Sequence, residues 1–206
     1  MKVNSDAHKE DILKAAMEVF GKEGYAGAST NEIVKNANVS KGLLFHHFKN
    51  KETLFNECQL YAMTQFAAFM TKNVDKSETD FFDRILTNLK IKMEFSCKNP
   101  EFLTFLNRTW LLEEKDTPFI RAAMEEMSAP QDERMKLFFN GIDTSQFRKN
   151  LDLYKIIDYT RIALEASWAR FFKRHHNDAD AMVKDMGSYL KEAEEIISLF
   201  RDGAYK

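Results

Sequence analysis

A run of basic side chains near the N-terminus is the part of the sequence whose chemistry is easiest to interpret. Between Ile33 and Lys51 the chain carries no acidic residue. The same segment holds the side chains that are cationic or can become so at Lys35, Lys41, His46, His47, Lys49 and Lys51. Such a run suits contact with phosphate groups. Charge alone would also fit a solvated helical hairpin with a chance lysine cluster.

No arrangement of residues typical of catalysis or metal binding is found. The five histidines form two adjacent pairs and one position near the N-terminus. Neighbouring side chains on a helix point about 100° apart, so neither pair is preset to chelate a metal ion. Cys58 and Cys97 are isolated and offer no disulfide framework. Motifs for a serine nucleophile, a phosphate-binding loop or a dinucleotide site are also missing, so we expect neither an enzyme nor a cofactor.

Two short predicted helices position the basic run. Ser29 can cap a helix over about 30–37 through a capping box. Asn38 tolerates the left-handed backbone that a tight turn needs. Ser40 can then cap a second helix over 41–48. Two short helices joined by a three-residue turn describe a helix-turn-helix.

The outward face of the second helix is the predicted reading surface. A helix docks into the major groove by its N-terminal residues, which would bring Lys41 and Leu43 to the base edges. Gly42 costs the helix about 1 kcal/mol relative to Ala, which makes sense if a side chain there would hold the helix away from DNA. The expected DNA contacts are Ser29, Thr30, Ser40, Lys41, Gly42, Leu43, Phe45, His46, His47 and Lys51.

These residues resemble the DNA-binding signature of the TetR family of transcriptional regulators. The resemblance rests on Val39-Ser40-Lys41-Gly42 and His47-Phe48-Lys49-Asn50-Lys51-Glu52, and it covers about residues 8 to 55. Asn38 stands where the family usually has Gly. Phe45 stands where it usually has Tyr, so a phosphate contact through a phenol oxygen is lost. The resemblance implies a homodimer that binds a double-stranded DNA operator, and a body domain that binds a small effector.

Composition and charge favour a helical chain with two parts. The 206 residues are 44% hydrophobic, and three prolines and seven glycines against eighteen phenylalanines favour helices over a turn-rich β fold. The net charge of −2 divides into +2 for residues 1–51 and −4 for the remainder, which fits DNA contact at one end. We expect an all-α fold, with a three-helix helix-turn-helix domain over residues 1–50 and a helical ligand-binding and dimerisation domain over residues 51–206.

Apolar spacing and capping residues predict about nine helices in all. The seven besides the short pair are expected over about 6–22, 51–72, 81–97, from 100 onward, from 118 onward, 151–175 and 178–201. Pro130 must break or kink the helix that starts near Pro118. The long helix from Lys51 would link the DNA-binding end to the body as one rod.

Many bulky aromatic and methionine side chains in the body fit either a plain core or a ligand pocket. A stripe of such residues at helical spacing is more often core, and the expectation of a pocket for a small apolar or amphipathic effector rests mainly on the family resemblance. The candidate ligand contacts are Phe66, Phe69, Phe105, Arg108, Trp110, Met127, Arg161, Glu165 and Trp168.

The last two predicted helices leave apolar surface that a second copy could cover. The helix over 151–175 is apolar on nearly every side, and no later element can cover the stripe of the helix over 178–201. A two-fold dimer with a four-helix bundle would bury both, and a monomeric core is the alternative. The expected interface residues are Ala163, Ala166, Trp168, Met186, Tyr189, Ala193, Ile197 and Phe200.

The sequence therefore predicts a ligand-responsive transcriptional regulator. We expect a repressor that binds a palindromic operator as a homodimer and is released by its effector. The rival hypothesis is a dimeric helical carrier of small molecules, or a scaffold, whose terminal hairpin only caps the bundle. The N-terminus has no apolar run and no segment has the apolar length of a membrane span, so we expect a cytoplasmic protein without a membrane partner.

Overall fold

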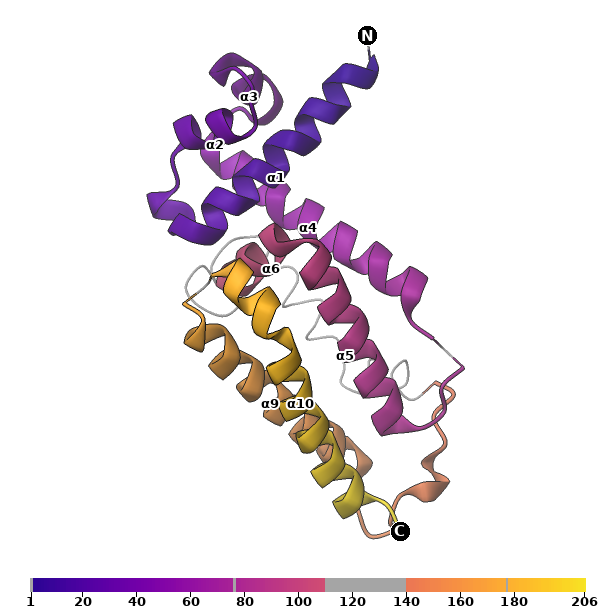
Figure 1. Ribbon diagram of the computed structural model, residues 1–206. Helices are drawn as coiled ribbons and strands as arrows, with labels where there is room; N and C mark the ends of the chain where they lie inside the picture. Colours follow the sequence, from indigo (N-terminus) through magenta and orange to yellow (C-terminus); the bar gives the residue numbers. More distant parts are fainter. Residues whose placement is uncertain (1, 76, 110–139, 177) are drawn as a thin grey trace.

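The computed structural model describes residues 2–75, 77–109, 140–176 and 178–206. Within these ranges the chain forms eight α-helices and one short 3-10 helix, and the predicted all-α fold is confirmed. The two chain ends lie at opposite ends of the molecule (Figure 1). The helix expected from Pro118 and the break expected at Pro130 fall outside the described residues.

Three helices form the N-terminal head: α1 (Lys2–Gly27), α2 (Thr30–Asn36) and α3 (Lys41–Phe48). The first helix begins earlier than predicted. Its regular part ends where the sequence indicated, because Gly24 adopts a φ of 72° that interrupts the helical backbone.

Helix α4 (Lys51–Asn73) starts in the head and continues along the body beside α5 (Figure 1). Its buried side chains join the core of the head to that of the body. Phe55 contacts Phe20 of α1 and Phe105 of α6, with ring centroids 4.9 and 5.6 Å apart. The hydrophobic core of the head therefore continues into the body without a break at residue 50.

The body consists of α5 (Phe81–Lys98), α6 (Pro100–Asn107), α9 (Leu153–Arg174) and α10 (Ala179–Ala204). Aspartates cap three of these helices, since the side chains of Asp80, Asp152 and Asp178 accept hydrogen bonds from backbone N–H groups of the first turn. Helices α9 and α10 lie side by side, and α10 also packs against α5 (Figure 1).

The segment over residues 141–150, which precedes α9, packs partly against the C-terminus. It contains the 3-10 helix Thr144–Gln146, and the buried Phe147 forms an isolated bridge with Tyr205. No helix in the described ranges is long and apolar enough to cross a membrane.

Candidate DNA-binding face and body cavity

The turn between α2 and α3 is held by short-range hydrogen bonds. Ser29 Oγ accepts from the N–H of Asn31 at 3.3 Å, and Ser40 Oγ accepts from the N–H of Leu43 at 3.1 Å. Asn38 adopts a φ of 52°, so its predicted left-handed conformation is confirmed. The two serine bonds cap the starts of α2 and α3, and the turn itself is closed by backbone bonds from Asn38 and Val39 to carbonyl groups at the end of α2.

Helix α3 buries one side and leaves the other open. Leu44 and Phe48 are buried in the head core, whereas Lys41, Gly42 and His46 are exposed. The remaining expected DNA contacts on this helix, Leu43, Phe45 and His47, are half-buried. The ring of Phe45 packs partly against the head core.

Gly42 has no structural reason inside the protein to be glycine. A Cβ atom built there would meet only Ser40 Oγ, at 3.9 Å, so the chain has room for a side chain. Glycine is disfavoured inside a helix, and its contacts within the described chain do not require it at this position. Close approach of α3 to the major groove of DNA would account for it.

Two lysines at the edges of this face are held by neutral groups. Lys41 Nζ donates to Asn31 Oδ1 at 3.0 Å, which places the ammonium between α2 and α3. Lys51 Nζ donates to the carbonyl oxygen of Ala26 at 3.3 Å and lies 4.9 Å from the ring centroid of Tyr25. Neither ammonium pairs with a carboxylate of the described residues, so both are available to a phosphate or base partner.

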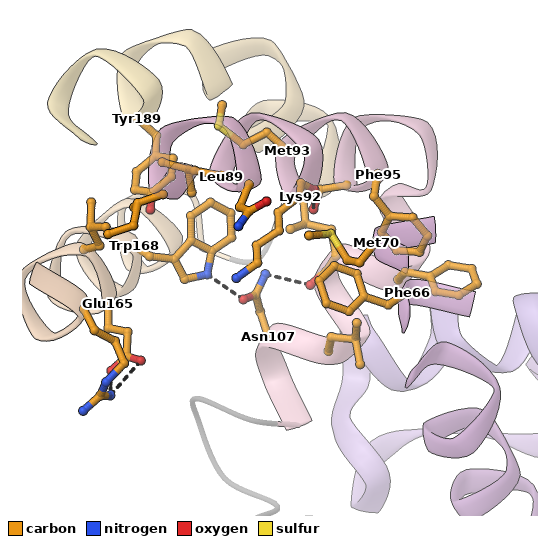
Figure 2. Close-up of a pocket in the computed structure, with 18 of the residues that line it drawn as sticks. Phe66, Met70, Leu89, Lys92, Met93, Phe95, Asn107, Glu165, Trp168 and Tyr189 are labelled. Carbon is orange, nitrogen blue, oxygen red and sulfur yellow. Dashed lines mark hydrogen bonds and ion pairs between the residues drawn. The ribbon is translucent and has the colours of Figure 1, made fainter. Parts of the chain in front are cut away.

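The body contains a cavity of about 930 Å³ between α4, α5, α6 and α9, with Tyr189 of α10 at one wall (Figure 2). Most of its surface is apolar. Phe66 and Met70 of α4, with Leu89 and Phe95 of α5, are among the side chains that form it. The size is at the upper end of the roughly 300–1,000 Å³ typical of sites for small molecules.

Polar side chains occupy defined places on the cavity wall. Trp168 Nε1 donates to Asn107 Oδ1 at 2.7 Å, and Asn107 Nδ2 donates to the Leu103 carbonyl at 2.7 Å (Figure 2). The first bond joins α9 to α6, and the second holds the Asn107 amide in place on α6. Arg161 donates to both carboxylate oxygens of Glu165 at 2.9 Å, and that contact raises the pKa of Arg161.

Four of the expected ligand contacts line this cavity, namely Phe66, Arg161, Glu165 and Trp168. Two others, Trp110 and Met127, lie outside the described residues. Binding of a ligand by the four remains a prediction.

The other three expected ligand contacts need correction, because their side chains belong to the junction between head and body or to its core. Phe105 is 1% exposed and packs between aromatic rings of α1 and α4. Arg108 Nη1 donates to the carbonyl of Lys22 at 2.9 Å. Phe69 packs against Phe95, with ring centroids 5.2 Å apart.

Five polar residues of the cavity wall were not anticipated as ligand contacts: Asn88, Lys92, Ser96, Asn107 and Asp158. A signal for Lys92 is present in the sequence, because it follows Leu89 by three positions and Ile85 by seven. It therefore lies on the apolar side of α5, where a lysine is unusual. Nothing local to residues 88 and 107 distinguishes those two asparagines from surface residues.

The expected dimer interface also needs correction. Met186, Tyr189, Ala193 and Ile197 are at most 4% exposed, because that stripe of α10 packs on the chain's own core. Trp168 likewise faces the cavity. Phe200 and Ala163 are half-buried, and of the expected residues only Ala166 is exposed.

Among the described residues, large apolar side chains are exposed on the outer sides of the same two helices, and Leu60 of α4 is exposed as well. Tyr159 and Ile162 of α9 are 52% and 51% exposed, and Leu199 of α10 is 74% exposed. On α9 the small residues Ala166 and Ala169 continue this stripe at helical spacing. Among the described residues there is no cluster of three or more side chains suited to hold a metal ion.

Comparison with protein families gives one match, which covers the head. Residues 12–58 match the family model described as "Bacterial regulatory proteins, tetR family". The match includes α2, α3 and the first turns of α4.

Curated relatives are similar over the same region. The HTH-type transcriptional regulator QacR of Staphylococcus aureus is 53% identical over 49 residues, which are 24% of this chain and 26% of the relative. The negative transcriptional regulator IcaR of the Staphylococcus epidermidis biofilm operon icaADBC is 30% identical over 67 residues, 32% of this chain and 36% of the relative. The chain thus matches well under two thirds of the length of these relatives.

Solved structures are similar over the whole chain. A TetR family transcriptional regulator from Chloroflexus aurantiacus superposes with a TM-score of 0.70 at 17% identity, covering 98% of this chain and 94% of that one. A putative tetR family regulator from Shewanella sp. PV-4 gives a TM-score of 0.60 at 20% identity, covering 97% and 98%. These likenesses establish a shared fold.

Proposed function

Residues 12–58 belong to the tetR family of bacterial regulatory proteins, and on this premise we propose that the chain is a transcriptional regulator that binds DNA through α3. The observation that supports the proposal most strongly is the coincidence of this match with the exposed, acid-free face around Lys41, Gly42 and His46. Residues 1–50 would be the DNA-binding domain and residues 51–206 the body, joined through α4. This role requires binding and no catalysis, and contact with the chromosome would place the protein in the cytoplasm.

The regulator acts in this proposal as a homodimer on a palindromic operator. The exposed stripe of α9 with Tyr159 and Ile162, together with the exposed Leu199 of α10, is the apolar surface that a second copy would cover. Two copies related by a two-fold axis present the same surface to each other, so a single stripe on each protomer is enough to form the interface. Two heads on one DNA molecule then bind more tightly than one, because the second head acts at a high effective concentration.

Repression relieved by an effector is the mode of action that we propose. Names of relatives support repression, since IcaR is a negative regulator and AcnR of Corynebacterium diphtheriae a repressor. The cavity supports an effector. Helix α6 lines that cavity with Leu103 and Asn107, and its Thr104 lies against Gly21 of α1. A ligand that displaces α6 therefore acts on the head, and coupling of about 1–3 kcal/mol would be typical.

A gel-shift experiment on the DNA upstream of the chain's own coding region tests DNA binding. We expect a shift whose affinity falls as salt rises, competed by the same DNA more effectively than by unrelated DNA. The matched control is Lys90→Ala, because Lys90 lies in α5 and pairs with Glu194, far from the head face in sequence. If no shift occurs even at low salt, the carrier or scaffold hypothesis replaces this one.

A further inference from the structure

Lys92 is placed unusually for a lysine. It lies on α5 between Leu89 and Met93 in the cavity wall. Figure 2 shows its side chain extending into the cavity in the direction of Asn107 and Trp168. Its ammonium makes no hydrogen bond or ion pair with any residue in the described ranges. The residue is nevertheless exposed to solvent.

The other charges on the wall are already paired. Arg161 contacts Glu165 at 2.9 Å and Asp158 at 3.4 Å. The amide oxygen of Asn107 accepts a hydrogen bond from Trp168, and its amide nitrogen donates one to the Leu103 carbonyl. Of the described cationic side chains on the wall, Lys92 alone lacks a carboxylate within ion-pair distance.

A ligand that fills the cavity removes the water that solvates this ammonium. Burial already lowers the pKa of Lys92, and the charge of Glu165 acts in the opposite direction as the smaller cause. A fully apolar ligand would leave an unpaired charge in an apolar site, which is costly. A cationic ligand would add repulsion. A ligand that places a negative charge beside the ammonium avoids both the cost of an unpaired buried charge and the repulsion between like charges.

We propose that the effector of this regulator is an amphipathic molecule with an apolar body and one anionic oxygen head group that pairs with Lys92. The inference rests on the proposed function, because it assigns the ligand class of the proposed effector cavity. The apolar body lies against Phe66, Met70, Leu89 and Trp168. Carboxylate, sulfate and phosphate monoester heads share the required chemistry.

Calorimetric titration of the full chain with four probes of one chain length separates head groups. The probes are decanoate, decyl sulfate, decan-1-ol and decyltrimethylammonium, each below its micelle concentration. We expect the two anions to bind more tightly than the alcohol, and the cation to bind weakest. Binding of decanoate together with decyl sulfate supports a general anion site, and binding of decanoate alone narrows it to a carboxylate site.

Lys92→Met keeps the apolar length of the side chain and removes its charge. Decanoate should bind this variant about tenfold to a hundredfold more weakly, as expected for loss of one charged hydrogen bond, while decan-1-ol should bind at least as well. Lys90→Met is the matched control on the same helix, since Lys90 pairs with Glu194 outside the cavity, and it should change neither affinity. Lys92→Gln serves as a second variant if the methionine variant does not fold.

Two results would overturn the inference: tighter binding of decyltrimethylammonium than of decanoate, or an unchanged ratio of decanoate to decan-1-ol affinity in both Lys92 variants. The titrations contain no DNA. A chain that binds decanoate through Lys92 but shifts no DNA would contradict the proposed function and leave the ligand class standing. A chain that binds its operator and no anionic probe would contradict the ligand class and leave the proposed function standing.

Discussion

The DNA-binding face and the cavity are built in opposite ways. The face comes from one continuous segment, from Ser29 to Lys51, and the hydrogen bonds that shape it span two or three residues. Five helices form the cavity wall, and the residues that line it extend from Phe66 to Tyr189 in the sequence. The face therefore depends on local capping, whereas the cavity depends on how distant helices pack. Substitutions should distinguish these two kinds of construction.

The largest effect is expected in the packed body. Ile197 of α10 is 3% exposed in a cluster with Phe81 and Phe82. Ile197→Asp places a carboxylate there without a partner and should lower the free energy of unfolding by about 3–5 kcal/mol. Urea denaturation followed by circular dichroism measures it.

Leu199→Asp is the matched control, two residues further along the same helix and 74% exposed before substitution. It should leave the protomer folded and shift sedimentation from dimer towards monomer. A folded, stable Ile197→Asp protein, or a Leu199→Asp protein that remains fully dimeric, would show that the inner and outer sides of α10 have been exchanged.

The junction between the two regions should show the next largest effect. A Cβ atom at Gly21 would lie 2.7 Å from Thr104 Oγ1 and 3.0 Å from the backbone nitrogen of Phe105. Gly21→Ala should therefore push α1 from α6 and destabilise the chain by about 1–3 kcal/mol, measured by the same urea denaturation.

Gly187→Ala tests whether this loss comes from the close approach. A Cβ atom at Gly187 meets nothing within 4 Å, and the position is inside α10. Alanine there should raise the free energy of unfolding by about 0.5–1 kcal/mol, because glycine is a poor helix former. Equal effects of the two substitutions would mean that α1 and α6 are not in tight contact.

Base reading should respond to a single change on α3. Lys41→Ala should cost about 1–3 kcal/mol at one operator position and relax the preference there. In the structure Lys41 Nζ donates a hydrogen bond to Asn31. Asn31→Ala is therefore the control, because it removes this hydrogen bond and keeps the charge of the lysine. An identical DNA motif selected by the Lys41→Ala protein and by the parent would contradict this role.

The smallest effect is expected at Lys51, at the start of α4. Lys51→Ala should weaken binding to all sequences about equally and lower the slope of log affinity against log salt by about one unit. Its present contacts, a carbonyl oxygen and the ring of Tyr25, do not neutralise its charge. A changed base preference at constant salt slope would show that Lys51 reads bases instead.

The sequence determined the head well because its signals are local. Capping by Ser40, the left-handed turn at Asn38 and the helix over 41–48 all agree with the structure. Apolar spacing on α10 also identified a real stripe with Met186 and Ile197, but spacing cannot say what covers it. Residues of α5 and α9 do so within the same chain, so the expected interface was wrong for the buried residues of this stripe.

The cavity was the least predictable part of the molecule. Phe105 and Phe66 are both phenylalanines at helical spacing, yet one lies in the core of the junction and the other in the cavity wall. Only the packing of α4 against α6 decides between them. Lys92 could have been identified from the sequence, because it is a lysine on the apolar face of a predicted helix.

Selection from random double-stranded DNA with the intact chain tests the central claim most directly. The claim is that the head of this protein reads DNA sequence and that two copies do so together. We predict enrichment of an inverted repeat, bound by the parent protein and lost or weakened to a single half-site with Leu199→Asp. Recovery of no common motif at low and moderate salt would contradict it.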